Sequence, residues 1–529
     1  MVMASFSLRE DYWETFKLQE EDIEFLYNYL LEIETPLTTQ ELLKALVDER
    51  IRREMQALER QRTSAGDVFL PKEHYSIDQK LVFPVFDWKR GEVVEVRPGR
   101  NPDLPEFQVI RVRMEDGEER EFASELAEHK LNEPPQLTLE DEMLDSGLVL
   151  EEFDSDLEER LEEGLKANED FVRIAGRWFP RALLVDVNVG HLNLAEAVLD
   201  MAGGGPVPTS ALLEQLELPS SANAKLVEFS LDLALEEDQR FDEVGPAGEV
   251  LWFLKRLEPE AVRETPLYLR YPEIDYDRSI LTPEMLALER ELDDELSPIE
   301  GRQPRADEVI VPLIFPHWRA GTLPLSSRIR HLFPTAYEAP RIRFMLVDRV
   351  TRDQFPGWVV RERMYVSGLL EWYEKNGLMP GSLVRVQRGK RPGEVIVSVD
   401  AQRSRRDWIR TVLVGSDGGI VFAMLKQTIT AAYDERMAVA VPDVENLDLV
   451  WSRQHKERQP FERVVVNMVR ELAKLNPQSH VHASELYATI NIVRRCPPGP
   501  MLALLISRPW FTHVGDLHFR FDDANHAQS

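Results

Sequence analysis

The sequence predicts a multidomain α+β protein built from several small modules, and three observations support this fold class. The chain has 529 residues, which is too long for one hydrophobic core and corresponds to about three to five domains. A pattern of helix, short strand, two helices and hairpin recurs along it. A strongly basic segment also interrupts an otherwise acidic chain, whose net charge is −31. With 43% hydrophobic and 30% charged residues, the chain can form real cores.

Cysteine usage and hydropathy indicate an intracellular protein. Cys496 is the only cysteine, so no intramolecular disulfide can form, which is typical of a reducing cytosol. The first residues, among them Arg9 and Glu10, contain no apolar signal-peptide run. No window reaches the roughly 18 uninterrupted apolar residues of a membrane span. We therefore expect a cytoplasmic location and no membrane partner.

The recurring pattern begins with an apolar helical stripe at 23–31, after which Thr35–Leu43 reads as a turn, a Thr cap and a second helix. Gly204–Leu213 and Ser479–Leu486 repeat this arrangement. Hairpins are predicted at 171–179, 240–254 and 510–521. Helix, short strand, two helices and a two-stranded wing is winged-helix order, so we expect several winged-helix-like modules.

One of these modules, residues 191–256, resembles the HARE-HTH family, the winged-helix class that includes the N-terminal domain of the RNA polymerase delta subunit. This resemblance implies a protein partner, because the acidic delta subunit works on the polymerase and does not read DNA sequence. Charge agrees for the preceding module: Glu140–Asp170 holds 14 acidic residues against Arg160 and Lys166, so its helix would repel a phosphate backbone. We expect these modules to contact proteins.

Aromatic pairs in the wings are the candidate partner contacts. We expect the tryptophans at 178, 252 and 510 to be core residues, because aromatics at the base of a wing fill the space beneath the helices. Each following phenylalanine, Phe179, Phe253 and Phe511, is expected to be the more exposed of its pair and to bind a partner.

A small β unit is predicted between the first two modules. Short alternating strands at 80–84, 90–97, 107–113 and 120–122 are separated by turn residues. Their pattern resembles five-stranded small barrels of the Tudor or KOW kind, which bind peptides, nucleic acid or neighbouring domains. Phe86 and Trp88 either line a groove of this unit or pack in its core.

The basic segment is the candidate nucleic-acid contact. Between His317 and Arg410 the chain has 18 Lys and Arg against 9 Asp and Glu, whereas the rest of the chain is strongly acidic. A local reversal of sign is typical of a surface that meets an anion. The alternatives are a solvated basic face and a docking surface for acidic segments of the same chain. We call residues 317–410 the basic island.

Strands and helices of the island follow a recognisable order, with strands at 311–316, 341–348 and 355–361, a strand and short helix at 322–334, and a helix, turn and strand at 368–386. This order resembles the pseudobarrel DNA-binding domain of plant auxin- and abscisic-acid-response transcription factors, which restriction-enzyme effector domains share. That family grips the major groove with two arms. The resemblance places Arg319, Arg328 and Arg330 in the first arm and Trp358, Arg361 and Arg363 in the second, with Arg341 and Arg343 on the strand between them.

Arginine suits either arm, because its planar fork clamps a phosphate or the O6/N7 edge of guanine. Only residues 362–366 separate the strand of the second arm from the next helix, fewer than in the family. The shorter arm favours phosphate binding over base reading.

Catalytic and metal-binding signatures are missing from the sequence. Arg388–Gly393 lacks the spacing and the Ser/Thr of a phosphate-binding loop, and Cys496 has no His and Asn/Asp partners in a catalytic signature. The histidines at 480, 482, 513 and 518 match no paired-ligand spacing. Asp293-Asp294-Glu295 reads as solvated linker. We expect no enzymatic activity, no metal and no cofactor.

The expected organisation is a helical, helix-turn-helix-like unit (1–63), a small β-barrel (66–131), an acidic winged-helix-like unit (137–190), a HARE-HTH-like winged helix (191–257), an acidic connector (258–308), a basic β-pseudobarrel (309–410), a strand-helix extension (411–455) and a C-terminal winged helix (456–522). The expected function is a non-enzymatic, nucleic-acid-associated adaptor in transcription or defence, which contacts duplex DNA through the island and a partner such as the transcription machinery through the acidic modules. Alternatives are a purely protein-binding scaffold or nucleic-acid mimic, and a non-catalytic subunit of a nuclease or DNA-modifying complex.

Overall fold

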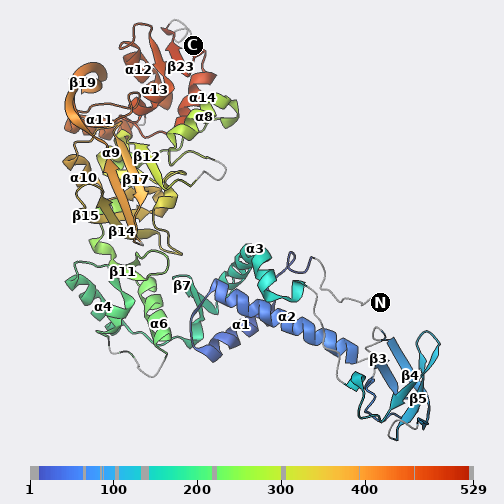
Figure 1. The fold of residues 1–529 in the computed structure, drawn as a ribbon. Helices are drawn as coiled ribbons and strands as arrows, with labels where there is room; N and C mark the ends of the chain where they lie inside the picture. Colours follow the sequence, from blue (N-terminus) through green and yellow to red (C-terminus); the bar gives the residue numbers. More distant parts are fainter. Residues whose placement is uncertain are drawn as a thin grey trace. The chain divides into compact units, whose positions relative to one another are not determined.

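The structure is a computed structural model, which describes residues 11–63, 67–83, 86, 89–101, 106–132, 142–216, 218, 223–299, 305–391, 393–416, 418–457 and 459–523. It confirms a mixed α+β, multidomain protein with several separate sheets (Figure 1). Two compact units are present, Met1–Val185 with Ser220–Phe229 and Asp186–Pro219 with Ser230–Ser529. Among the described residues, no helix combines the length and apolar composition of a membrane span.

The first unit contains a module that is assembled from two distant parts of the chain. Its elements are α1 (Glu20–Ile33), β1 (Leu37–Thr38), α2 (Thr39–Thr63), α3 (Ser146–Lys166), β7 (Phe171–Ile174) and β8 (Arg177–Pro180). Strand β1 pairs with β8, with Leu37 opposite Trp178, and the sheet order is β1-β8-β7. The segments 1–63 and 137–190, predicted as separate units, are therefore one module. A long insertion separates its second and third helices, so no local pattern reveals the pairing.

That insertion is the small β unit, a five-stranded sheet in the order β2-β3-β4-β5-β6. Its strands are β2 (Asp67–Val68), β3 (Lys80–Phe83), β4 (Lys89–Pro98), β5 (Gln108–Met114) and β6 (Glu119–Ser124). The four predicted strands are confirmed, and β2 is added. Phe86 packs against the rings of Phe83 and Phe122 at the edge of the core, whereas Trp88 lies outside the described residues.

Two further modules share one order of elements, and both belong to the second unit except for residues 224–229 of the first module, which belong to the first unit. The first has α4 (Val189–Met201), β9 (Val207–Pro208), α5 (Thr209–Leu213), α6 (Ala224–Glu237), β10 (Phe241–Glu243) and β11 (Leu251–Leu254). The second has α12 (Phe461–Ala473), β21 (His480–His482), α13 (Ala483–Ile490), α14 (Pro498–Ser507), β22 (Phe511–Gly515) and β23 (His518–Phe521). In each, the first short strand pairs with the second strand of the hairpin.

Strand register corrects the alignment of the hairpins. Trp252 lies opposite Val207, and Phe519 lies opposite Val481, so Phe519 and not Trp510 is the counterpart of Trp252. The Trp252 Nε1 donates to Thr209 Oγ1 and to Asp232 Oδ1, both at 3.0 Å, which fixes the wing beneath its helices. Trp178 makes the corresponding bond to Thr39 Oγ1 in the first unit, also at 3.0 Å.

All six hairpin aromatics are buried. The prediction that the tryptophans at 178, 252 and 510 are core residues is confirmed, whereas the following phenylalanines, expected to be the more exposed of each pair, are buried as well. Phe179, Phe253 and Phe511 are 1%, 5% and 7% exposed. Phe179 packs edge-on against Phe229 at a ring separation of 6.2 Å, and Phe511 packs against Phe521 of its own hairpin at 5.5 Å. Neighbouring side chains of a strand point to opposite faces, so burial of both members of each pair means that both faces are covered.

Residues 308–399, which include most of the basic island, form a curled, half-barrel sheet of seven strands in the order β12-β17-β18-β14-β15-β16-β13. The strands are β12 (Glu308–Pro312), β13 (Thr322–Pro324), β14 (Arg341–Asp348), β15 (Gln354–Val360), β16 (Tyr365–Ser367), β17 (Leu383–Arg388) and β18 (Glu394–Val399), with helices α9 (Phe315–Ala320) and α10 (Leu370–Lys375). The strand expected at 311–316 is partly wrong. It ends at Pro312, because Pro316 sits at the start of α9 and Gly321, at φ 63°, ends that helix.

Beyond the half-barrel, β19 (Ala401–Val414) and β20 (Ile420–Ala431) form a separate two-stranded ribbon, followed by α11 (Val444–Glu457). The domain boundary predicted at residue 410 falls inside β19 and is therefore wrong. The predicted boundary coincides with the end of the basic segment, but β19 continues to Val414 because its backbone groups pair with those of β20.

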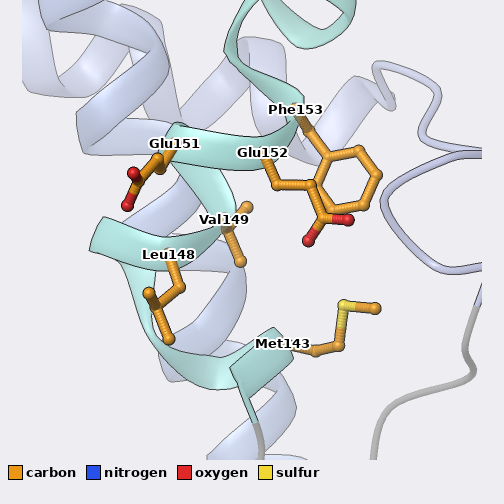
Figure 2. Close-up of a pocket in the computed structure, with 6 residues that line it drawn as sticks. All are labelled: Met143, Leu148, Val149, Glu151, Glu152 and Phe153. Carbon is orange, nitrogen blue, oxygen red and sulfur yellow. The ribbon is translucent and has the colours of Figure 1, made fainter.

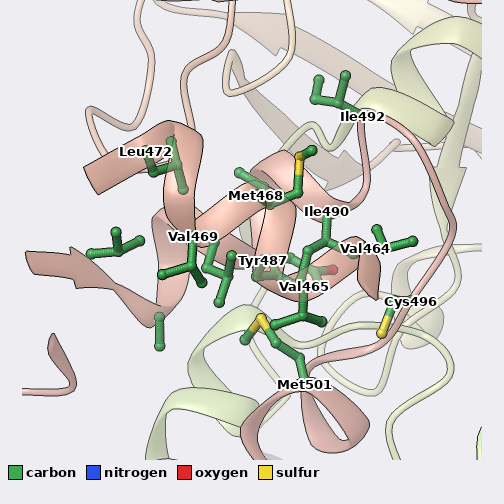
Figure 3. Packing of buried hydrophobic residues seen from close by; sticks show 14 of the residues in the cluster. Val464, Val465, Met468, Val469, Leu472, Tyr487, Ile490, Ile492, Cys496 and Met501 are labelled. Carbon is green, nitrogen blue, oxygen red and sulfur yellow. The ribbon is translucent and has the colours of Figure 1, made fainter. Parts of the chain in front are cut away.

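The segment 258–308, predicted as a solvated acidic connector, is packed against the rest of the second unit. Leu281, Met285 and Leu288, the last two on α8 (Pro283–Leu292), join a large core with α12, α13 and α14. Figure 3 shows Val465, Met468 and other side chains from this core. Burying α8 carries the acidic residues at its end into the interior.

Asp294 and Glu295 form a buried ionic network with Arg495, which is completely buried. Two guanidinium nitrogens donate to the two oxygens of Asp294 at 2.8 and 2.6 Å, and one also reaches Glu295 Oε1 at 2.8 Å. His317 Nε2 lies 3.1 Å from the same Glu295 oxygen. Burial alone would raise the pKa of Glu295, but the charges of Arg495 and His317 hold it below its usual value. The prediction that these carboxylates are solvated is wrong.

We expect Arg495→Ala to destabilise the protein by about 3–5 kcal/mol, because it leaves two buried carboxylates without their countercharge. Urea unfolding of the full chain measures the loss. Arg463→Ala, at an exposed arginine of α12 with no ion pair in the described part of the chain, is the matched control and should change stability by less than about 0.5 kcal/mol. An equal, small effect of both substitutions would contradict a structural role for the network.

Candidate nucleic-acid interface

Two of the three arginines predicted for the first arm are engaged by the protein itself. Arg319 Nη2 donates to Asp448 Oδ2 of α11 at 2.8 Å, and its guanidinium lies over the ring of Tyr268. Arg328 Nη2 donates to the Glu291 carbonyl at 2.9 Å, while its backbone N–H bonds to Asp293. Both arginines therefore hold the half-barrel to neighbouring segments of the second unit.

The second arm is covered by another part of the second unit. Trp358 is only 3% exposed and packs edge-on against Phe253 of β11, with ring centroids 5.2 Å apart. Arg363 donates to the carbonyls of Val262 and Arg263, at 3.2 and 2.7 Å. Trp358 is thus unable to contact DNA in this arrangement, contrary to the prediction.

Strand β14 takes part in the same docking. Arg341 Nη1 lies 2.8 Å from Asp242 Oδ2 and 3.3 Å from Glu258 Oε2. The backbone N–H of Arg343 donates to the Val244 carbonyl at 2.8 Å. The Arg343 side chain is half-buried without an ion pair in the described residues, and burial lowers its pKa. The arginines expected on this strand therefore face the 191–263 segment.

This contact corresponds to one alternative left open by the sequence, in which the island docks acidic segments of its own chain. Phe253 was predicted to contact another protein, but it packs against Trp358 of the same unit. The match is one of charge and shape, because an acidic module meets a basic strand and two large rings meet edge to face. The sequence does not show which acidic segment docks on the island, because neither distance nor pairing is visible in a linear chain.

Exposed cations remain in the predicted arms and at the β17–β18 turn of the half-barrel. Arg330 and Arg361 are the exposed members of the predicted arms, and Arg361 donates to the Ala339 carbonyl at 3.0 Å. Arg330 has no ion pair among the described residues and lies beside the β17–β18 turn, where Arg388 donates to the His331 carbonyl. Lys390 and Arg391 occupy that turn and are exposed; Arg391 reaches Glu394 only at 3.8 Å. We call Arg330, Arg388, Lys390 and Arg391 the turn cluster.

In the sequence, Arg388–Gly393 has the charge of a phosphate-binding loop but not its spacing, and no other role was predicted for it. The signal that could have found the turn cluster is a run of cations at a Gly-containing hairpin turn, next to a second arginine-rich segment. The ladder of β17 and β18 pairs backbone groups as far as Arg388 and Val395, and it does not cover the side chains at the turn between them.

A pocket of about 270 Å³ lies in the first unit, at the start of α3 (Figure 2). Met143, Val149 and Phe153 give it an apolar lining, and Glu151 and Glu152 give it negative charge. Its charge is wrong for a phosphate. Within the described residues, no cluster of His, Cys, Asp and Glu could hold a metal ion, and burial raises the pKa of the Cys496 thiol above its usual value.

The 191–263 segment contains buried carboxylates, which should make the free energy of unfolding depend on pH. Burial raises the pKa of Glu243 to about 8, from an ordinary value of 4.5. A carboxyl whose pKa is raised on folding stabilises fully below pH 4.5, and this contribution is lost as pH rises to about 8. We expect the stability of the full chain to fall between pH 5 and 8, and Glu243→Gln to reduce that slope, as measured by urea unfolding.

Glu371→Gln, at an exposed position of α10, is the control for this titration and should leave the slope unchanged. A residual slope is expected in Glu243→Gln, because burial also raises the pKa of Glu258 to about 8. A slope in Glu243→Gln as steep as in the natural protein would refute the assignment.

Comparisons with known proteins add no relative. Neither a protein-family model nor a curated protein nor a solved structure matches the chain. The candidate interface is therefore defined by the charges and contacts of the chain itself: an occupied second arm, a partly occupied first arm, and an exposed turn cluster beside it.

Proposed function

We propose that the protein is a non-enzymatic, nucleic-acid-associated adaptor that contacts duplex DNA through the turn cluster. The carrying observation is the exposure of these four cations at one end of the half-barrel, with one long ion pair among them, in a chain of net charge −31. Elsewhere in the island, arginines at 319, 341 and 363 are used inside the protein. Exposed cations that form no short ion pair are the ones available to an outside anion; Arg388 is such a cation, although it also donates to the His331 carbonyl.

The chemistry of the turn cluster suits phosphate contact. Guanidinium groups clamp phosphate oxygens bidentately, and an ammonium group adds a point charge. Such contacts position a protein on a duplex without reading its sequence. With Trp358 covered, the base-reading role of the second arm is not part of the proposal.

The finer fold assignments support this function. The order of strands and helices in 308–399 agrees with the pseudobarrel class, and the order in 189–254 and 461–521 agrees with winged helices. The five-stranded unit at 67–124 agrees with a Tudor- or KOW-like barrel. We assign the winged-helix-like modules to protein contact, because the one at 189–254 already uses its wing to dock a protein surface.

A second candidate is a protein-binding scaffold in which the island stays closed, and the covered second arm favours it. A non-catalytic subunit of a nuclease or DNA-modifying complex, in transcription or defence, is compatible with the same surface. Duplex binding by the intact chain separates these candidates.

We expect Arg330→Ala combined with Lys390→Ala to weaken binding of duplex DNA of any sequence. Losing two phosphate contacts should make the slope of log K against log salt shallower by about 1–2 units. Fluorescence anisotropy with two unrelated duplexes at several salt concentrations measures both effects. Arg463→Ala is the control for removal of an exposed arginine. Duplex affinity that is unchanged in the double variant, or missing in the natural protein at low salt, would reject the proposal.

A further inference from the structure

The β19–β20 ribbon carries a basic and aromatic face that the proposed function does not use. We propose that this face binds single-stranded nucleic acid, with Trp408 as a stacking platform for a base and Arg406 and Lys426 as phosphate contacts. The ribbon contains the last arginines of the basic island, and it lies outside the seven-stranded sheet (Figure 1). The proposal does not depend on the turn cluster or on duplex binding.

Strand register places the three residues on one face. Trp408 lies directly opposite Lys426, and Arg406 lies opposite Thr428. Side chains alternate along a strand, so residues 406 and 408 share a face with 426 and 428. Nearest neighbours on that face are within contact distance across the ladder.

Trp408 stands out among the tryptophans of the described residues, because it alone is largely exposed, at 58%. Its ring has no aromatic neighbour in the described part of the chain, and Lys426 Nζ lies over it at 5.3 Å from the centroid. The Lys426 ammonium group can contact a phosphate, and the exposed surface of the Trp408 indole can stack on a base. Stacking of a base on such a ring contributes about 1–3 kcal/mol.

Charge on the face is complementary to a polyanion. Arg406 is exposed and has no ion pair among the described residues, and no carboxylate occupies this face from 406 to 412 or from 422 to 428. The acidic neighbour, Asp407, points to the opposite face, where it pairs with Arg405 at 3.1 Å. Glu485 approaches this face at Arg410, with which it pairs. In a chain of net charge −31, the part of the face around Arg406, Trp408 and Lys426 is the one that a phosphate backbone can approach.

Both ends of the platform are anchored. Val412 and Phe422 are buried in the large core of the second unit, and Ile409 and Ile429 are buried in a separate cluster. Arg410, next along the strand, is buried and paired with Glu485 at 2.8 Å. The exposed residues thus project from a ribbon whose backbone is fixed, so little conformational entropy is lost on binding.

A single strand fits this face better than the other anionic partners. A flat indole stacks only on a base that is not already stacked in a duplex, and unpaired bases are available in single strands. An acidic peptide would use the two cations but not the exposed ring. A membrane surface would use the ring and the cations, and it is an outcome of the test.

The test uses the full chain, with fluorescein-labelled oligo(dT) and oligo(rU) followed by anisotropy. We expect Trp408→Ala to lower affinity about 5- to 150-fold, which corresponds to about 1–3 kcal/mol, and Trp408→Phe to retain most of it. Arg406→Ala with Lys426→Ala should make the salt slope shallower by about one unit. Saturation with either strand should quench tryptophan emission in the natural protein, and Trp408→Phe should lose that component.

Matched controls are Tyr337→Ala, at an aromatic residue that is 53% exposed, and Arg463→Ala; both should bind as the natural protein does. Thermal melts should be unchanged in Trp408→Ala, because the side chain is exposed. Affinity that is equal in Trp408→Ala and the natural protein would overturn the proposal. So would binding confined to phosphatidylserine vesicles or to polyglutamate. Retained single-strand binding in the Arg330→Ala, Lys390→Ala variant separates this site from the duplex site.

Discussion

The second unit depends on one buried charge, the guanidinium of Arg495, which is fully enclosed between Asp294 and Glu295. Its partners lie about 200 positions away in the sequence, and His317 of the half-barrel completes the set. A buried ion pair of this kind contributes modestly when intact, but loss of one member is costly because the other charge stays buried. The network therefore requires that α8, the half-barrel and the C-terminal module occupy their places together.

The same competition for partners determines which cations face solvent. The chain has 94 acidic and 63 basic residues, so most arginines can find a carboxylate within the protein. Arg319, Arg341 and Arg495 have done so, and Arg363 has found two backbone carbonyls instead. Exposed cations without a short ion pair include Arg330 and Lys390 at one end of the half-barrel and Arg406 on the ribbon. Local charge density alone thus overstates the anion-binding surface, and the candidate sites move from the predicted arms to the turn cluster and the Trp408 face.

Prediction from the sequence succeeded where a feature depends on neighbours along the chain. Alternation located β14, β15 and β17, and turn residues located the hairpins, because side-chain period and backbone turns are local properties. It failed at 1–63 with 137–190 and at the boundary at 410, because both depend on which strand pairs with which. For the candidate site, it placed both Arg330 and Trp358 in DNA-contacting arms. The structure leaves Arg330 exposed and covers Trp358 with Phe253, a contact that nothing in the sequence reveals.

By itself, the sequence determined an α+β chain of small modules, the positions of most strands and helices, and a basic island in an acidic protein. Periodicity, turn chemistry and charge are properties of the residues and their order, so they can be determined from the sequence alone. Only the tertiary structure decided that the acidic triplet at 293–295 is buried, that the second arm is covered, and that Trp408 is open. Each of these is set by desolvation and by long-range pairing, where a charge or ring takes whichever partner the fold brings within a few ångströms.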